Sequence, residues 1–203
     1  ENKKILILGF GKEGIDSYLA LRKIFPQKVL AVADKKELKS FDKKIQAILT
    51  KDKNLKKYFG QNYLTKAGPV RGGASNGAGD YDLIIKTPGI SRKELNSFLE
   101  GRSLTPSSSS RITSQTEIFF NNFPGLIIGV TGTKGKGTTS GLIYQILKTA
   151  GFKAFWLGNV GNPVMQSLLK AKPDHIAVYE ISAQQLQNLK KSPAISVFLN
   201  LFS

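Results

Sequence analysis

The 203-residue sequence lacks cysteine altogether, and it has one histidine, one methionine and one tryptophan. The absence of cysteine excludes disulfides, zinc–thiolate sites and cysteine nucleophiles. No apolar run approaches the roughly 20 residues that a membrane-spanning helix needs. The first residues, Glu1 to Lys4, lead directly into an apolar segment and resemble neither a signal nor a transit peptide. We therefore expect a cytoplasmic protein that does not enter a membrane.

Acidic residues are scarce too: 14 Asp and Glu stand against 30 Lys and Arg, which gives a formal net charge of +16. Such a charge could mark a nucleic-acid binder. The lysines are scattered through amphipathic segments, however, and no block of about five like charges occurs. No run interleaves basic and aromatic residues as a stacking platform would. We interpret the charge as a solvated lysine-rich surface that favours small anionic ligands, with nucleic-acid binding as a minor alternative.

The first half carries the pattern of a dinucleotide-type domain. An apolar strand, Lys4 to Leu8, ends in the motif Gly9-Phe-Gly-Lys-Glu-Gly14, and a helical pattern follows over residues 15–24. A second strand, over residues 28–33, closes on Asp34. This order of elements predicts a nucleotide pocket: a strand, a glycine turn, a helix and a second strand that ends in an acidic residue. Asp34 would accept hydrogen bonds from a ribose or a base edge there; the alternative is that it only ends a strand.

The remainder of this half predicts further alternating elements. Residues 35–66 are lysine-rich with spaced apolar positions, which predicts helices and a short strand, and the glycine-rich residues 68–79 predict a loop. Asp82 to Ile85 is a strand of the buried type. The turn Thr87-Pro88-Gly89 would then lie at the carboxyl edge of the sheet, where open α/β sheets bind ligands. A helix is expected over residues 92–100.

The stretch 101–110, with a proline and four consecutive serines, predicts a linker. We place two domains around it, residues 1–104 and 105–203. Strands and helices alternate in both, so we predict the α/β class with mainly parallel sheets. The first domain is expected to be Rossmann-like and the second to be the first half of a P-loop ATPase-type domain.

The second domain contains the most informative stretch, Gly129-Val-Thr-Gly-Thr-Lys-Gly-Lys-Gly-Thr-Thr139. It lies between an apolar strand and an apolar helical pattern, as a phosphate-binding loop requires. Glycines let backbone N–H groups turn towards an anion, the helix N-terminus adds positive potential, and Lys136 neutralises phosphate oxygens. The common pattern has glycine at position 130 and a hydroxyl at position 137, where this chain has Val130 and Gly137. The loop is therefore a variant.

Two further strands of this domain end in polar motifs, Gly158-Asn-Val-Gly-Asn-Pro163 and Glu180-Ile-Ser-Ala-Gln-Gln-Leu186. Parallel strands bring their carboxyl ends to one edge, so these groups can share a crevice with the phosphate loop. Glu180 lies where P-loop enzymes place a carboxylate for Mg²⁺; the alternative is an exposed strand-end glutamate. Ser182 and Gln185, three residues apart, would lie on one face of a helix over residues 182–189.

As a set, the three motifs of the second domain resemble landmarks of the Mur ligases, which are ATP-dependent amide-forming enzymes of peptidoglycan synthesis. The motif that begins at Glu180 is similar to one characteristic of the D-glutamate-adding branch, with Ala183 and Gln184 in place of Ser and Phe. The first domain, with Asp34 and the turn at Thr87, is similar to the uridine-diphosphate-binding domain of the family.

The resemblance implies a ligase that adds D-glutamate to UDP-N-acetylmuramoyl-L-alanine through an acyl phosphate, with ATP and Mg²⁺ as cofactors, in cell-wall synthesis and cell division. A monomer is expected. The resemblance also implies a role for each part of the second site. ATP would lie against Gly132, Thr133, Lys134, Gly135, Lys136, Gly137, Thr138 and Thr139. Lys136 and Glu180 would be the catalytic residues, and Thr138 and Glu180 would be the metal ligands. The resemblance implies that the substrate is held by Asn159, Ser182 and Gln185 at the muramoyl end and by Lys12, Glu13, Asp34, Lys35, Thr87, Pro88 and Gly89 at the UDP end.

The sequence departs from the family in two respects. Gly137 replaces a hydroxyl that normally helps to bind magnesium, and Thr138 would have to substitute for it from the next position. Family members continue past the position of Asn200-Leu201 into an Asp-His segment, a carbamylated lysine and a third domain that binds the amino acid. We therefore expect this chain to be a fragment that does not complete the reaction by itself.

Two alternatives stay open at this point. Another Mur ligase that adds a different amino acid would share the same ATP-binding half. The first domain could instead be a nicotinamide-binding Rossmann domain joined to an unrelated NTPase domain. Binding of a UDP-sugar without binding of NADH would favour the ligase.

Overall fold

A computed structural model of the chain describes residues 3–68, 81–99, 112–187 and 189–201. The chain forms two compact units, Glu1–Thr113 and Ser114–Ser203. The boundary predicted between residues 104 and 105 lies outside the described residues, as do the predicted linker and nearly all of the predicted loop at 68–79. No helix in the described ranges is long and apolar enough to cross a membrane.

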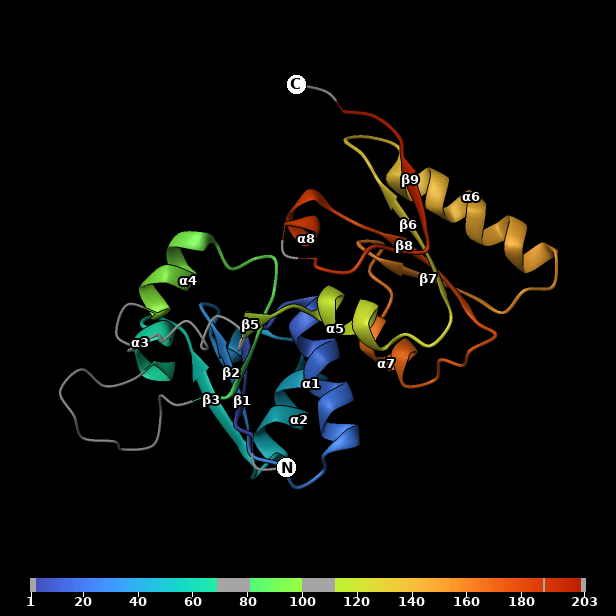
Figure 1. The fold of residues 1–203 in the computed structure, drawn as a ribbon. Helices are drawn as coiled ribbons and strands as arrows, with labels where there is room; N and C mark the ends of the chain where they lie inside the picture. Colours follow the sequence, from blue (N-terminus) through green and yellow to red (C-terminus); the bar gives the residue numbers. More distant parts are fainter. Residues whose placement is uncertain (1–2, 69–80, 100–111, 188, 202–203) are drawn as a thin grey trace. The chain divides into compact units, whose positions relative to one another are not determined.

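The first unit is built on a five-stranded sheet (Figure 1), in which all of the paired strands run parallel in the order β3-β2-β1-β4-β5. Its strands are β1 (Ile5–Leu8), β2 (Leu30–Asp34), β3 (Leu55–Phe59), β4 (Leu83–Lys86) and β5 (Ile112–Thr113). Its helices are α1 (Lys12–Ile24), the 3₁₀ turn η1 (Leu38–Ser40), α2 (Lys43–Lys51), α3 (Tyr63–Ala67) and α4 (Arg92–Leu99).

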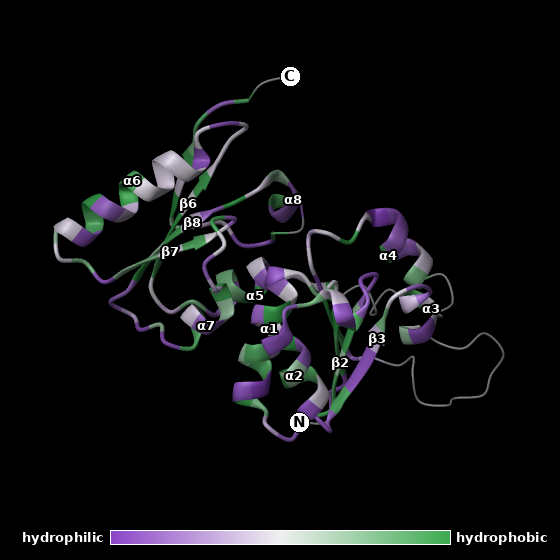
Figure 2. Cartoon of the chain, turned by 180° about the vertical axis from the view of Figure 1, so that it is seen from behind, coloured by the Kyte–Doolittle hydropathy of each residue, from purple (hydrophilic) through white to green (hydrophobic). Residues whose placement is uncertain are grey.

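The composition of the strands explains this sheet. Strands β1 and β2 are buried along their whole length, as expected of continuous apolar runs covered by helices on both faces. Strand β3 lies at the edge of the sheet and carries the exposed Lys56 and Lys57, and Figure 2 shows its middle as hydrophilic. Charged side chains on an edge strand discourage pairing with other chains.

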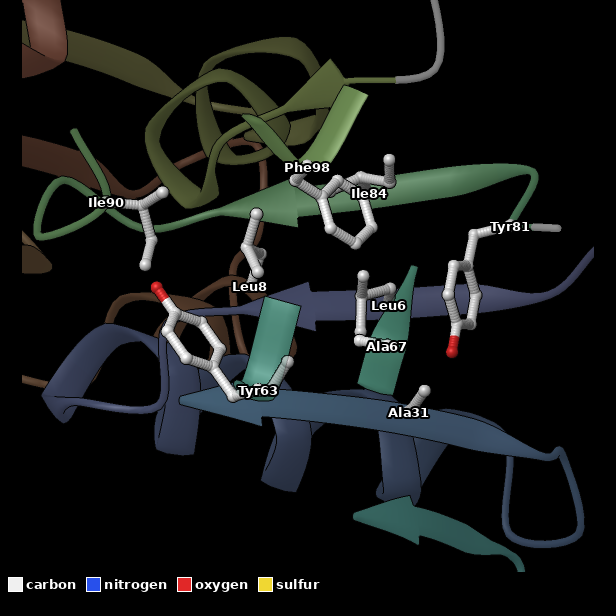
Figure 3. Packing of buried hydrophobic residues seen from close by; sticks show 10 residues of the cluster. Leu6, Leu8, Ala31, Tyr63, Ala67, Tyr81, Ile84, Ile90 and Phe98 are labelled. Carbon is white, nitrogen blue, oxygen red and sulfur yellow. The ribbon is translucent and has the colours of Figure 1, made fainter. Parts of the chain in front are cut away.

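One hydrophobic core of the first unit lies between the sheet and helices α3 and α4. Figure 3 shows Leu6 and Leu8 of β1 facing the aromatic rings of Tyr63 and Phe98. Ile90, which follows the turn at Thr87, packs into the same cluster. The turn after β4 is therefore fixed to the core by the residue that comes next in the sequence.

The second unit contains a four-stranded parallel sheet with the order β7-β8-β6-β9. Its strands are β6 (Leu126–Thr131), β7 (Ala154–Gly158), β8 (Ile176–Glu180) and β9 (Ile195–Phe198). Its helices are α5 (Gln115–Asn122), α6 (Lys136–Thr149), α7 (Val164–Leu168) and α8 (Ala183–Leu186). Its hydrophobic core contains Phe119 and Phe120 of α5 and Phe123, which directly follows α5. The rings of Phe119 and Phe120 pack against Tyr179 of β8.

The predicted α/β class with parallel sheets is confirmed in both units. Element ends differ by a few residues. The strand predicted from residue 28 begins at Leu30, and the helix predicted over residues 15–24 begins earlier, at Lys12. The length predicted for the helix over residues 182–189 was wrong, because α8 is a single turn that ends at Leu186.

Candidate functional site

The loop between β6 and α6 has the geometry that its glycines predict. Gly132 and Gly135 have φ values of +147° and +83°, a region that residues with a Cβ atom rarely occupy. A Cβ atom on Gly132 would also lie 3.0 Å from the Cβ atom of Leu199, so a side chain there would press against the residue that follows β9. The loop is closely packed as well as strongly curved.

Lys136 is the first residue of α6, and its ammonium group turns back over the loop. Nζ donates hydrogen bonds to the carbonyl oxygens of Gly132, at 2.7 Å, and of Thr133, at 3.1 Å. The hydrogen bond from the amide of Thr139 to the carbonyl of Gly135 marks the first closed turn of the helix. The amides of residues 136–138 precede that bond, and N–H groups at a helix start attract anions.

Glu180, the last residue of β8, is brought next to this helix start. Strand β8 pairs with β6 so that Glu180 is in register with Val130, two residues before the loop. The Glu180 side chain is buried, with only 6% of the residue exposed, and Oε1 accepts a hydrogen bond of 3.3 Å from Nδ2 of Asn159. A Cβ atom on Gly137 would lie 3.2 Å from Oε2, so the other carboxylate oxygen is at the first turn of α6.

This arrangement fits a magnesium ion that is bound mainly through a nucleotide. The described ranges contain no group of three or more histidine, cysteine or acidic side chains that could hold a metal, whereas the single carboxylate of Glu180 lies beside the first turn of α6. Mg²⁺ is commonly held by one or two carboxylates together with phosphate oxygens and water. Thr138 is exposed in the same helical turn.

The strand end at Gly158 explains how Asn159 reaches Glu180. Gly158 has a φ of +95°, and a Cβ atom there would lie 2.0 Å from the carbonyl oxygen of Glu180. The amide of Asn159 donates to that same carbonyl at 3.1 Å. The absence of a side chain at position 158 thus lets β7 and β8 end together, with the Asn159 amide group beside the Glu180 carboxylate.

Ser182 and Gln185 do come together as predicted, but they bond to each other. The Ser182 hydroxyl accepts from the Gln185 amide at 3.3 Å, and Gln185 Oε1 accepts from the Ser182 amide at 2.9 Å. This is a capping box at the start of α8. The spacing Ser-x-x-Gln is a recognised signal for it, which our sequence interpretation did not use.

In the first unit, Asp34 ends β2 in a buried position with 8% exposure. Its two carboxylate oxygens accept hydrogen bonds from the amides of Phe10, in the glycine turn, and of Lys36, the latter at 2.8 Å. A Cβ atom on Gly9 would lie 2.0 Å from Oγ1 of Thr87. Asp34 therefore joins β2 to the glycine turn, and Gly9 lets that turn meet the turn after β4.

The other residues predicted for the UDP end lie at the carboxyl ends of the same strands. Lys12 and Glu13 begin α1 after the glycine turn, Lys35 follows Asp34, and the exposed Pro88 and Gly89 follow Thr87. The structure thus collects residues from three segments at one edge of the sheet, where open α/β sheets bind ligands.

Two neighbours of this edge were not predicted. Glu94 of α4 accepts hydrogen bonds from the hydroxyl of Ser91, at 2.7 Å, and from the hydroxyl of Tyr63, at 3.1 Å. These hydrogen bonds lower the pKa of Glu94, and the bond from Ser91 has the larger effect. Lys86, at the end of β4, is half-buried, and burial lowers its pKa although the charge of Glu13 opposes the shift. The sequence pattern Ser-x-x-Glu could have indicated the first of these contacts.

The chain is similar in sequence to known proteins. Residues 130–203 match the family described as the Mur ligase middle domain. UDP-N-acetylmuramoylalanine–D-glutamate ligase of Clostridium botulinum (strain Hall) is 35% identical over 142 residues, which are 70% of this chain and 28% of that protein. The enzyme of the same name from Clostridium kluyveri is 34% identical over 151 residues, or 74% of this chain and 30% of that protein.

A solved structure supports the fold. The crystal structure of UDP-N-acetylmuramate:L-alanyl-gamma-D-glutamyl-meso-diaminopimelate ligase from Neisseria meningitides aligns over 100% of this chain and 61% of that chain, with a TM-score of 0.51 and 16% identity. The chain matches under a third of the length of the two clostridial relatives. The family match over residues 130–203 and the curated relatives thus both relate this chain to the Mur ligases.

Proposed function

We propose that this chain supplies the ATP-phosphate site and the UDP-substrate site of a ligase that adds D-glutamate to UDP-N-acetylmuramoyl-L-alanine. The observation that carries the proposal is the juxtaposition of Lys136, the amides at the start of α6 and the buried carboxylate of Glu180. A cation, N–H donors and a metal-binding carboxylate are the groups that phosphoryl transfer needs. The proposed location is the cytoplasm, and the proposed state is a monomer.

The proposed reaction has two steps. The terminal carboxylate of the UDP-substrate attacks the γ-phosphorus of ATP, which forms an acyl phosphate and releases ADP. The amine of D-glutamate then attacks the acyl carbon, the amide bond forms, and inorganic phosphate leaves with the electron pair of the broken C–O bond. The amine loses a proton in this step.

The residues of this chain would act mainly by orientation and charge. Lys136 would exchange its hydrogen bonds to the loop carbonyls for bonds to phosphate oxygens, together with the N–H groups at the start of α6. Glu180, with Thr138 as a second candidate ligand, would hold Mg²⁺, which when bound neutralises phosphate charge. Asn159 would keep the Glu180 carboxylate in place through its hydrogen bond to Oε1.

For the substrate we propose the residues that the resemblance implies. Asn159, Ser182 and Gln185 lie after β7 and β8, at the same sheet edge as the phosphate loop. The capping box leaves the Ser182 and Gln185 side chains fixed relative to each other, which favours recognition of a rigid group. In the first unit, the glycine turn and the residues that follow β2 and β4 would hold the UDP end.

The similarity to the clostridial enzymes supports the proposal that both units come from one kind of ligase. The 142 aligned residues outnumber those of the second unit, Ser114–Ser203, so the similarity extends into the first unit as well. This extension disfavours a nicotinamide-binding domain joined to an unrelated NTPase. Another Mur ligase that adds a different amino acid is the remaining alternative.

The test is a set of binding titrations and one assay. The 203-residue chain should bind Mg²⁺–ATP and UDP-N-acetylmuramoyl-L-alanine in calorimetry and should not bind NADH; the opposite pattern would overturn the proposal. Phosphate release is then measured with ATP, the UDP-substrate and a panel of amino acids, with D-glutamate as the expected acceptor for the complete enzyme. We predict that the 203 residues alone do not turn over, and robust release would contradict this.

A further inference from the structure

Asn200, which follows β9, makes three hydrogen bonds to the phosphate loop. Its side-chain Oδ1 accepts from the amide of Lys134 at 2.9 Å, and its Nδ2 donates to the carbonyl of Lys134 at 3.1 Å. Its own backbone carbonyl accepts from the amide of Thr133 at 3.0 Å. Consecutive peptide groups of the loop are therefore held by one residue that lies 66 positions away from Lys134.

The surrounding contacts make this a close fit. The amide of Leu199 donates to the carbonyl of Thr131 at 3.0 Å, which continues the pairing of β9 with β6 (Figure 1) up to the loop. A Cβ atom on Gly132 would lie 3.2 Å from the backbone N and O of Asn200. The end of β9 thus lies directly against the loop backbone, and Asn200 is the position whose side chain bonds to it.

These bonds divide the loop into two parts. The amides of Thr133 and Lys134 donate to Asn200, so the amides that can turn to an anion begin at Gly135. The carbonyl of Thr133 also accepts from Nζ of Lys136 at 3.1 Å. Asn200 thus holds the peptide groups on both sides of Thr133, and the carbonyl of the second of these groups also accepts the hydrogen bond from Lys136.

We propose that Asn200 is a positioning residue for ATP, which fixes the first half of the loop so that Lys136 and the amides from Gly135 onward meet the phosphates. This inference rests on the proposed function and extends it to a residue outside the loop. The role requires one donor and one acceptor on the same short side chain, because Lys134 uses both its N–H and its C=O. Asparagine provides both, whereas ionised aspartate provides acceptors only.

The experiment compares Asn200→Ala, Asn200→Asp and the control Asn122→Ala in the 203-residue chain. Asn122 also makes one side-chain bond to a backbone carbonyl, but it does so within α5 and away from the loop. The first measurement is hydrogen exchange of single amides by NMR without nucleotide. Exchange at Lys134 should accelerate by up to about tenfold in Asn200→Ala, the range expected for one lost hydrogen bond, and should stay slow in Asn200→Asp.

The second measurement is a double-mutant cycle for Mg²⁺–ATP affinity with Lys136→Ala. We expect Asn200→Ala to weaken binding about tenfold and to have much less effect when Lys136 is already absent. A residue that only stabilised the fold would lower affinity equally in both backgrounds. Far-UV circular dichroism of each variant checks that it is folded. If the alanine variant is not folded, Asn200→Asp takes its place in the affinity cycle, because aspartate cannot donate to the Lys134 carbonyl.

The outcomes separate the two proposals. If exchange at Lys134 is the same in all variants, or if the cycle is additive, the positioning role of Asn200 is overturned while ATP binding can stand. If the wild-type chain binds no Mg²⁺–ATP but exchange responds as expected, Asn200 does hold the loop and the proposed function fails instead. Acceleration in Asn200→Ala alone, together with a non-additive cycle, supports both.

Discussion

A Cβ atom on Gly137 would lie 3.2 Å from Oε2 of Glu180, so the residue after the phosphate-loop lysine directly faces the buried carboxylate. Position 137 is where the common loop pattern has a hydroxyl. The contact means that a serine side chain introduced there would begin beside Glu180. The glycine therefore leaves a space at the place where a hydroxyl ligand and a carboxylate ligand would otherwise stand together.

The first prediction concerns Gly137→Ser. The added hydroxyl should tighten Mg²⁺–ATP binding by about three- to tenfold, the range expected for one additional polar contact, if the glycine has cost the site a ligand. Isothermal calorimetry with and without Mg²⁺ measures this, and the gain should be present only with the metal. An unchanged affinity would mean that Thr138 already serves as the hydroxyl.

Gly137→Ala is the matched control. It adds the same Cβ atom beside Glu180 and improves helix propensity by about 0.5–1 kcal/mol, but it brings no hydroxyl. We expect its Mg²⁺-dependent affinity to equal that of the wild type or to fall slightly, because the Glu180 carboxylate must shift by a few tenths of an ångström to admit the methyl group. An equal gain in both variants would assign the effect to the helix and not to the metal.

The second prediction is that Glu180→Gln raises the Mg²⁺ concentration needed for ATP binding by at least about tenfold. Glutamine keeps the size of the side chain and removes its charge, and even partners one step removed from a metal typically contribute about 10–100-fold in affinity. A magnesium titration at fixed ATP provides the measurement. Asp174→Asn is the control, since Asp174 is an exposed carboxylate of the same unit that pairs with Lys153 at 2.8 Å.

Much of this site could be predicted from the sequence because its parts are local. The glycines, Lys136 and the preceding apolar strand are contiguous, and a strand that ends in Glu180 indicates a position at the carboxyl edge of a parallel sheet. The fold class followed from the same alternation of apolar strands and helices. Local patterns of this kind depend on neighbours within a few residues.

Other features depend on strand order, which the sequence does not state. Asn200 meets the loop only because β9 pairs with β6, while β8 pairs with β6 on the other side. The hydrogen bond from Phe10 in the glycine turn to Asp34 likewise joins residues 24 positions apart. The length of α8 was overestimated because the apolar spacing continued beyond Leu186, whereas the capping box of Ser182 and Gln185 begins a helix of a single turn.

The third prediction tests whether Asp34 is structural. Asp34→Asn replaces one acceptor by a donor that faces a backbone N–H group, so it should reduce the stability of the first unit by about 1–3 kcal/mol. Urea unfolding followed by far-UV circular dichroism, with hydrogen exchange of β1 and β2, measures this. Fluorescence of the single tryptophan would not suffice, because Trp156 lies in the second unit. Loss of UDP-substrate binding without loss of stability would contradict a structural role.

Asp42→Asn provides the comparison for Asp34. Asp42 caps α2 and accepts a hydrogen bond of 2.8 Å from the amide of Lys44 in an exposed position. Asparagine is about as good an N-cap as aspartate, so this variant should unfold within about 0.5 kcal/mol of the wild type. The same chemical change thus has different expected costs at the two positions, because only Asp34 is buried between two backbone donors.

The fourth prediction is a pH dependence at Glu94. Hydrogen bonds from Ser91 and Tyr63 lower the pKa of Glu94 from its ordinary value of 4.5, because they stabilise the ionised carboxylate of the folded state. A lowered pKa in the folded state contributes stability that is fully present above pH 4.5. That contribution is lost as the pH falls below 4.5 and passes through the folded pKa.

Glu94→Gln should therefore be less stable than the wild type at pH 7. We expect a difference of about 1 kcal/mol in the free energy of unfolding, as for the loss of a capping interaction. This difference should shrink as the pH falls below 4.5. Urea unfolding of both proteins at a series of pH values measures the difference. Glu37→Gln, in an exposed part of the same unit, should show no such convergence, because its contact with Lys39 is a solvent-exposed pair. A constant difference between Glu94→Gln and the wild type at all pH values would show that the carboxylate charge does not matter, and that the side chain acts at this helix start by its shape alone.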